Sequence, residues 1–120
     1  MDKIILVDSS KESMQVTKSV LERCGYEVIS HDNGQEALAA LQQGEEANII
    51  LLDTTVPEVR DDEFAQKIKE LCNKHICIAL ITENRQDTSL IEKYDAAGCI
   101  NKPFKLQDLL APIAKCIENA

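Results

Sequence analysis

A chain of 120 residues has room for one compact domain, and 44% hydrophobic residues are enough to bury an ordinary core. The net charge of −8 argues against a basic face of the kind that binds DNA, RNA or anionic membranes. The apolar runs are too short to span a membrane, and the first residues lack the features of a secretory signal. We therefore expect a cytoplasmic protein with no direct contact to nucleic acid or membrane.

Apolar runs and helical stripes alternate along the whole chain. The runs are short and continuous, which is typical of strands buried on both faces of a sheet. Between them, apolar residues recur at the three- and four-residue spacing of a helix with one buried face. In chain order, we expect strands at residues 4–7, 26–30, 48–53, 76–82 and 98–101.

Five helices are predicted between and after these strands. Gly25 ends the first helix, and Asn33-Gly34 begins the second. Pro112 lies inside the last helix and removes a backbone donor, so we expect a kink or a delayed start there. The residues expected to face inward are Met14, Thr17, Leu21 and Cys24, then Ala37, Ala40 and Leu41, then Phe64, Ile68 and Leu71, then Leu90, Ile91 and Tyr94, and finally Leu106, Leu109, Leu110, Ile113 and Ile117.

This alternation predicts an α/β fold, with a single domain over residues 1–120. Buried strands joined by helices form a parallel sheet with helices on both faces, and right-handed crossovers restrict its topology. For five strands we expect the flavodoxin-like order 2-1-3-4-5. Ligands of such sheets bind at the carboxyl ends of the strands, where the strand order reverses. Here that place lies between the first and third strands.

The five cysteines support neither a disulfide framework nor a metal site. Their number is odd, no Cys-x-x-Cys occurs, and the chain has only two histidines. We expect small buried thiols in a reducing cytoplasm. The residues concerned are Cys24, Cys72, Cys77, Cys99 and Cys116.

Polar residues stand at the carboxyl ends of four predicted strands. Asp8 follows the first strand, Asp53 ends the third, Thr82 ends the fourth, and Lys102 follows the fifth. Two carboxylates, a hydroxyl and an ammonium in one cleft suit a divalent cation and a phosphoryl group. A carboxylate can also act as the nucleophile in phosphoryl transfer.

Each of these residues also has a structural interpretation. Asp8 could cap the first helix, Thr82 is an ordinary strand residue, and Lys102 could be a counter-charge for the two aspartates. An ionised carboxylate after four apolar residues is costly unless it is paired or functional, which favours function for Asp53. Ser9, with Glu12 three residues on, forms a capping-box pattern, and we expect it to cap the first helix.

Several motifs resemble the receiver domains of bacterial response regulators. None is specific alone, but together they occur in order at nearly the expected spacings, from Lys3 to about Ile117. The matching pieces are Ile-Leu-Val-Asp at 5–8, Gly-Tyr-Glu-Val at 25–28, Gly-x-Glu-Ala-Leu at 34–38, Ile-Leu-Leu-Asp at 50–53, Pro57, Leu-Ile-Thr at 80–82 and Lys-Pro-Phe at 102–104.

The resemblance implies a role for each site residue. Asp53 would accept a phosphoryl group from the phosphohistidine of a partner. Magnesium would be held by Asp8, by Asp53 and by the backbone carbonyl of Thr55, with Ser9 a poor candidate for its shell. Thr82 would bond a phosphoryl oxygen, and Lys102 would pair with the phosphoryl group. The Lys102–Pro103 bond would be cis.

The resemblance also implies partners. A sensor histidine kinase or a phosphotransfer protein would supply the phosphoryl group, and an effector domain or a downstream protein would receive the signal. The family leaves room for a homodimer through the last helices. Phosphoryl acceptance and slow hydrolysis would occur at one residue, so the chain would not be an enzyme in the usual sense.

Four positions depart from the family pattern. Ser9 stands where a second acidic residue is usual, Arg60-Asp61 replaces Asp-Gly, Glu83 replaces a small residue, and Cys99 replaces the aromatic of the fifth strand. These departures motivate a second interpretation, a degenerate receiver that binds proteins without phosphorylation. A third interpretation is a flavin-binding protein, because Ser9-Ser10-x-x-Ser13 could form a phosphate-binding loop.

Overall fold

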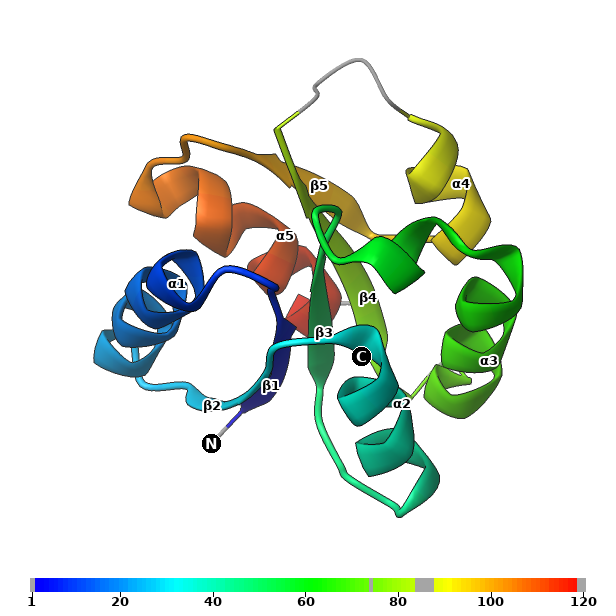
Figure 1. Ribbon diagram of the computed structural model, residues 1–120. Coiled ribbons are helices and arrows are strands. Elements are labelled where there is room, and N and C mark those ends of the chain that lie inside the picture. Colours follow the sequence, from blue (N-terminus) through cyan, green and yellow to red (C-terminus); the bar gives the residue numbers. More distant parts are fainter. Residues whose placement is uncertain (1, 74, 84–87, 119–120) are drawn as a thin grey trace.

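The computed structural model describes residues 2–73, 75–83 and 88–118 (Figure 1). Within these ranges five strands and five helices alternate, with one short 3-10 helix, η1, at Pro57–Arg60. The strands are β1 Lys3–Val7, β2 Glu27–His31, β3 Ile49–Asp53, β4 Cys77–Thr82 and β5 Gly98–Asn101. The helices are α1 Lys11–Arg23, α2 Gly34–Gln42, α3 Asp62–Cys72, α4 Ser89–Tyr94 and α5 Leu106–Glu118.

All strand pairs are parallel, and the order across the sheet is β2-β1-β3-β4-β5. This confirms the predicted α/β fold and the flavodoxin-like order. In the register, Ile5 of β1 lies between Ile29 of β2 and Ile50 of β3. Figure 1 shows α1 and α5 on one face of the sheet and α2, α3 and α4 on the other. Within the described ranges, no helix has the length and apolar character needed to cross a bilayer.

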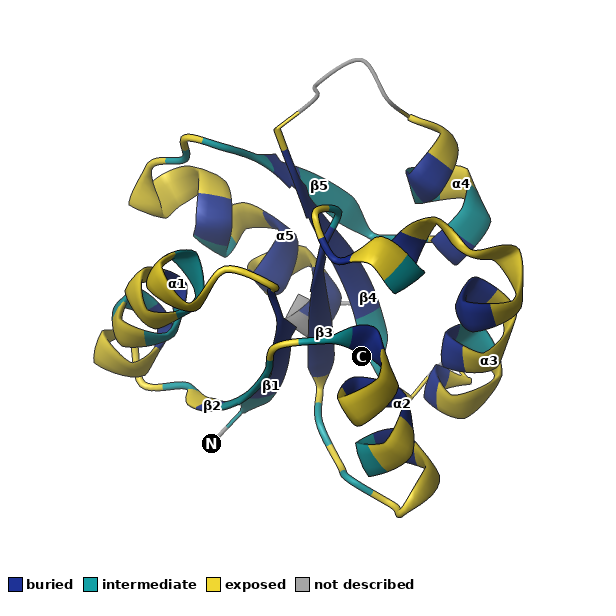
Figure 2. Cartoon of the chain, viewed as in Figure 1, coloured by how far each residue is buried: buried dark blue, intermediate teal, exposed yellow. Residues whose placement is uncertain are grey.

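The sheet separates two hydrophobic cores. Alternate side chains of a strand point to opposite faces, so Ile4 and Leu6 pack toward α1 and α5, while Ile5 and Val7 pack toward α2, α3 and α4. Both faces are covered, which is why the central strands β1, β3 and β4 are almost continuously apolar rather than alternating. Figure 2 shows the central strands β1, β3 and β4 mostly buried, the edge strands β2 and β5 mostly intermediate, and the outer faces of the helices exposed.

The first helix is capped by Ser10, not by Ser9 as expected. The hydroxyl of Ser10 accepts a hydrogen bond from the backbone N–H of Ser13 at 3.3 Å. Ser9 is exposed and lies one residue too early for this geometry. The prediction at α2 was correct, because Asn33 caps that helix by accepting from the N–H of Glu36 at 2.8 Å.

Three residues expected to face the core are exposed. Cys24 follows the last residue of α1 and is no longer on the buried face of that helix. Near the end of α3 the buried residue is Cys72 instead of Leu71. Leu106, the first residue of α5, is 50% exposed, whereas Leu109 and Ile113 are fully buried. Ile117 was also expected to face inward, but its side chain lies outside the described part of the chain.

α5 begins at Leu106 and includes Pro112, so of the two expected effects the delayed start was wrong and the kink stays a prediction. Pro112 is buried and packs on β5, where Gly98 leaves room for its ring. A Cβ atom added to Gly98 would lie 3.3 Å from the Cβ of Pro112. The proline is therefore accommodated by close contact with a glycine of the sheet.

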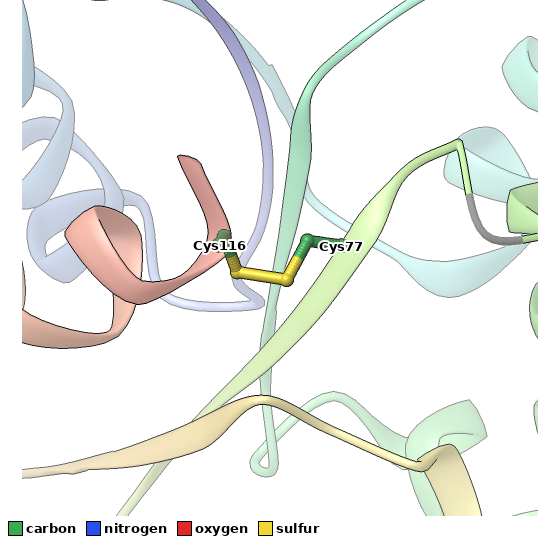
Figure 3. Close-up of a disulfide and its surroundings, with 2 residues drawn as sticks. All are labelled: Cys77 and Cys116. Atoms are coloured by element: carbon green, nitrogen blue, oxygen red, sulfur yellow. A yellow bond between two sulfur atoms is a disulfide. The ribbon is translucent and has the colours of Figure 1, made fainter. Parts of the chain in front are cut away.

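Cys77 and Cys116 form a disulfide between β4 and α5 (Figure 3). The expectation of five free thiols was wrong for these two residues, which are 39 positions apart in sequence. α5 runs back along the sheet, so its end lies beside the amino end of β4, and sequence spacing cannot reveal this. Of the other cysteines, Cys24 is exposed, Cys72 is buried and Cys99 is half-buried.

Candidate functional site

Four predicted site residues converge at the carboxyl edge of the sheet. Asp53 ends β3 and Thr82 ends β4, while Asp8 follows β1 and Lys102 follows β5. Asp8 and Asp53 are almost completely buried, at 0% and 1% exposure, and Thr82 is also buried. The peptide bond between Lys102 and Pro103 is cis, as the sequence motif implied.

Lys102 is the counter-charge of the two buried aspartates. Its Nζ lies 2.5 Å from Oδ2 of Asp53 and 3.8 Å from Oδ2 of Asp8. Its backbone N–H donates to the carbonyl of Thr82 at 2.8 Å, which positions the residue next to β4. One ammonium faces two carboxylates, so this cluster carries a net negative charge and can attract a cation.

The carboxylate of Asp53 has two different oxygen atoms. Oδ1 accepts from the backbone N–H of Thr55 at 2.9 Å and from its hydroxyl at 2.7 Å. Oδ2 is buried, makes the ion pair with Lys102 and has no hydrogen bond. Asp8 repeats this division, since its Oδ1 accepts from the N–H of Ser10 at 2.9 Å and its Oδ2 has no hydrogen bond.

These two oxygen atoms without hydrogen bonds fit a magnesium ion. Magnesium takes oxygen ligands, and proteins hold it with one or two carboxylates while several waters remain bound. In the described residues no group of three or more acidic, histidine or cysteine side chains could hold a metal ion. Asp8, Asp53 and the backbone carbonyl of Thr55 are the residues that would hold it.

Ser9 is placed beside the site but is exposed. Its hydroxyl lies 3.2 Å from the hydroxyl of Thr55, which is itself bonded to Asp53. Glu83 is exposed as well, and it lines a cleft of about 590 Å³ together with Lys102, Glu12 and Ser13. The acidic side chains at the mouth of this cleft therefore face solvent.

Two contacts of the site were not predicted from the sequence. Lys102 donates to the hydroxyl of Ser13 at 2.9 Å, which links the ammonium to the first turn of α1. The hydroxyl of Tyr94 donates to the carbonyl of Val59 at 2.6 Å, which ties α4 to the loop after Asp53. The position of Ser13 in the helix that follows Asp8 was a sequence signal for the first contact. For the second contact, the sequence showed only that Tyr94 lies on the apolar face of a helix, and nothing indicated its partner.

A second link joins α4 to the start of α3. Nζ of Lys93 lies 2.6 Å from the carboxylate of Asp62 and also donates to the carbonyl of Arg60 at 3.2 Å. The hydrogen bond and the charge of Lys93 lower the pKa of Asp62. Asp62 is exposed, so this pair contributes little to stability.

Comparison with known proteins gives consistent matches. The family model of the response regulator receiver domain matches residues 4–114. The "Transcriptional regulatory protein CpxR homolog" of Haemophilus influenzae is 30% identical over 100% of this chain and 52% of its own length. The "Transcriptional regulatory protein CrdR" of Helicobacter pylori is 32% identical over 94% of this chain and 54% of its own length. The chain thus spans about half the length of these relatives.

Solved structures match in the same way. A CheY-like response regulator receiver domain from Methanospirillum hungatei has a TM-score of 0.85 at 26% identity, covering 99% of this chain and 95% of its own. The response regulator TrrA of Thermotoga maritima, solved in complex with Mg(2+)-BeF, has a TM-score of 0.83 at 26% identity, covering 97% of this chain and 99% of its own.

Proposed function

The chain belongs to the response regulator receiver domain family of two-component signalling, and on that premise we propose that Asp53 is its phosphoacceptor. The observation that carries the proposal is the state of the Asp53 carboxylate. This carboxylate is buried at the end of β3, with one oxygen held by Thr55 and the other facing Lys102. The family match leaves the flavin-binding alternative without support.

The geometry gives each residue a chemical task. Asp53 supplies the attacking oxygen, and the two hydrogen bonds from Thr55 to Oδ1 hold its carboxylate in one orientation. Attack on a phosphohistidine would form the aspartyl phosphate and release the histidine. Lys102 would then pair with the phosphoryl oxygens, and Thr82 would donate its hydroxyl to one of them. Thr82 ends β4, the neighbour of β3, and Lys102 follows β5, the next strand across the sheet.

Magnesium is the cofactor that we propose for this site. It would be held by Asp8, Asp53 and the carbonyl of Thr55, and it would supply positive charge against the phosphoryl oxygens. Support comes from the oxygens of Asp8 and Asp53 that have no hydrogen bonds and from the Mg(2+)-BeF complex of the similar Thermotoga protein. Ser9 would contribute a neutral hydroxyl where the family has a carboxylate.

We propose a sensor histidine kinase or a phosphotransfer protein as the phosphoryl donor, acting in the cytoplasm. The relatives are named transcriptional regulatory proteins and are about twice as long as this chain, which supports an effector domain or a downstream protein as the output. The chain would accept one phosphoryl group and lose it by slow hydrolysis, so it would not be an enzyme in the usual sense. Dimerisation through the last helices belongs to the same proposal, as does the assignment of residues 1–120 to one receiver domain.

Acetyl phosphate with magnesium tests the phosphoacceptor. We expect one phosphoryl group to be added to the wild type, and none to Asp53→Asn, when the intact mass is measured. Asp32→Asn is a matched control, because Asp32 is exposed and stands outside the carboxylate cluster. Labelling that survives in Asp53→Asn would contradict the assignment. A wild type that stays unlabelled would favour the degenerate receiver.

A further inference from the structure

The disulfide lies at the end of the sheet opposite the carboxylate cluster. Cys77, the first residue of β4, pairs with Ile49 of β3, four residues before Asp53. At the rise of a strand this places Cys77 about 13 Å from the register position of Asp53. We propose that Cys77 and Cys116 are a reversible redox site that exchanges with small thiols and disulfides of the glutathione class and thereby fixes or releases the second half of α5.

The disulfide is accessible from a cavity of about 480 Å³ at this end of the molecule, lined in part by Cys77, Cys116, Lys69 and His75. The size is within the range of pockets that hold small organic ligands. Cys77 is half-buried, whereas Cys116 is buried, so we expect a solvent thiol to attack at the sulfur of Cys77. Disulfides of cytosolic proteins are more often redox-active than structural.

Cys72 lines the same cavity but does not compete for the bond. Burial raises the pKa of the Cys72 thiol to about 12, so it stays protonated at neutral pH. The thiolate, not the thiol, attacks disulfides. Cys72 therefore does not exchange with the Cys77–Cys116 disulfide. Whether this disulfide is oxidised or reduced depends on the thiols and disulfides of the surrounding solution.

Reduction proceeds by two exchanges. A glutathione thiolate attacks the sulfur of Cys77, the bond to Cys116 breaks, and Cys116 leaves as a thiolate that takes a proton from water. A second glutathione thiolate attacks the mixed disulfide, releases Cys77 as a thiolate that is protonated in turn, and forms glutathione disulfide. Two electrons pass from the two glutathiones to the protein, and oxidation by glutathione disulfide is the reverse of these steps.

α5, the helix that carries Cys116, lacks a backbone hydrogen bond near its middle. The disulfide is therefore important for holding the end of this helix. Pro112 has no N–H to donate to the preceding turn, so the hydrogen-bond ladder of α5 is interrupted there. Beyond it, Ile113 and Cys116 are the buried attachments described for residues 113–116. Loss of the disulfide removes a covalent attachment from residues 113–118, which have a weakened hydrogen-bond connection to the first half of α5. We therefore expect residues 113–118 to open more often in the reduced protein.

Equilibration of the full chain in glutathione buffers of graded ratio tests the redox site. After rapid alkylation, peptide mass spectrometry reports each cysteine. We expect Cys77 and Cys116 to gain and lose the label together, with the mixed disulfide on Cys77, while Cys72 stays unlabelled in the folded protein. The proposal is overturned if the pair remains oxidised in excess reduced glutathione, remains reduced in excess glutathione disulfide, or if Cys72 is found bonded to either partner.

Hydrogen exchange tests the consequence for α5. We expect exchange in residues 113–118 to rise at least tenfold on reduction, and to be equally fast in the double variant Cys77→Ser, Cys116→Ser. Cys24→Ser is the control, because Cys24 is exposed and does not line the cavity. Equal exchange in the two redox states of the wild type would overturn the effect on α5, and this comparison stands even if the double variant fails to fold. Neither measurement depends on phosphorylation of Asp53.

Discussion

The two oxygen atoms of the Asp53 carboxylate are chemically equivalent, but neighbouring residues give them different contacts. Thr55 holds Oδ1 with two hydrogen bonds, while Oδ2 has only the charge of Lys102. A buried carboxylate that is held in one orientation reaches the reactive geometry without further loss of rotational freedom. Asp8 has the same division, because its Oδ1 accepts a hydrogen bond and its Oδ2 has none.

Ser9→Asp should strengthen magnesium binding. The substitution adds a negative charge beside Thr55 and restores the acidic pair that is usual in the family. The helix cap is not at risk, because Ser10 caps α1. We expect a gain on the order of 0.5–3 kcal/mol in binding free energy, the usual range for interacting residues in contact. Magnesium titration at fixed pH and ionic strength measures it.

Ser9→Asn is the matched control for this titration, since asparagine has the size of aspartate without its charge. It should bind magnesium about as well as the wild type. Equal affinities of the wild type and Ser9→Asp would show that Ser9 is no deficit and that other oxygens complete the metal shell.

At the scale of elements, α4 is tied to the loop that follows Asp53. The helix is short, at six residues, yet Tyr94 is fully buried and its hydroxyl bonds the carbonyl of Val59 in η1. Burial raises the pKa of the Tyr94 hydroxyl, so it remains a donor at all physiological pH values. Cys99, which stands in place of the family's aromatic, packs at the edge of the same core. A change at the Asp53 loop therefore has a direct route to α4 through Tyr94.

Tyr94→Phe should destabilise the protein by about 1–3 kcal/mol, because the buried carbonyl of Val59 loses its donor. The aromatic ring is retained, so packing changes little. Urea denaturation of the unphosphorylated protein gives the free energy of unfolding. Tyr26→Phe is the control: Tyr26 is only half-buried, and we expect a change within about 0.5 kcal/mol. Equal losses in both variants would argue against a special role for the Tyr94 hydroxyl.

At the scale of the whole molecule, the fold brings buried charged residues together at one edge of the sheet. The chain carries a net charge of −8, and two of its carboxylates are buried together with one lysine as counter-charge. Unfolding separates these carboxylates, so a cation that bridges them binds the native state alone. A metal ion bound at this cluster would therefore also raise the global stability of the protein.

Magnesium should raise the free energy of unfolding of the whole domain. At 100 times the dissociation constant we expect a gain of about 2.7 kcal/mol, seen as a higher urea midpoint with an unchanged slope. Sodium chloride at matched ionic strength is the necessary control, because salt alone relieves repulsion in an acidic protein. The magnesium-specific gain should disappear in Asp8→Asn and persist in Asp32→Asn. A gain that survives in Asp8→Asn would show that magnesium acts elsewhere.

Much of this protein was readable from its sequence. The strands and the placement of Asp8, Asp53, Thr82 and Lys102 at one edge were predicted from apolar runs followed by polar residues, and the strand order from the preferred topology of five β/α units. These signals are local, because a strand buried on both faces needs apolar residues in a row, and parallel strands bring their carboxyl ends to one edge.

Only the tertiary structure decided the contacts between elements. The bond from Lys102 to Ser13, the bond from Tyr94 to Val59 and the disulfide from Cys77 to Cys116 join residues 89, 35 and 39 positions apart. Local periodicity carries no information on such pairs. They depend on how far each helix extends along the sheet and on which of its side chains then meets a strand or loop. The amino end of β4 meets the end of α5 for that reason, and two cysteines expected to be free thiols are bonded there.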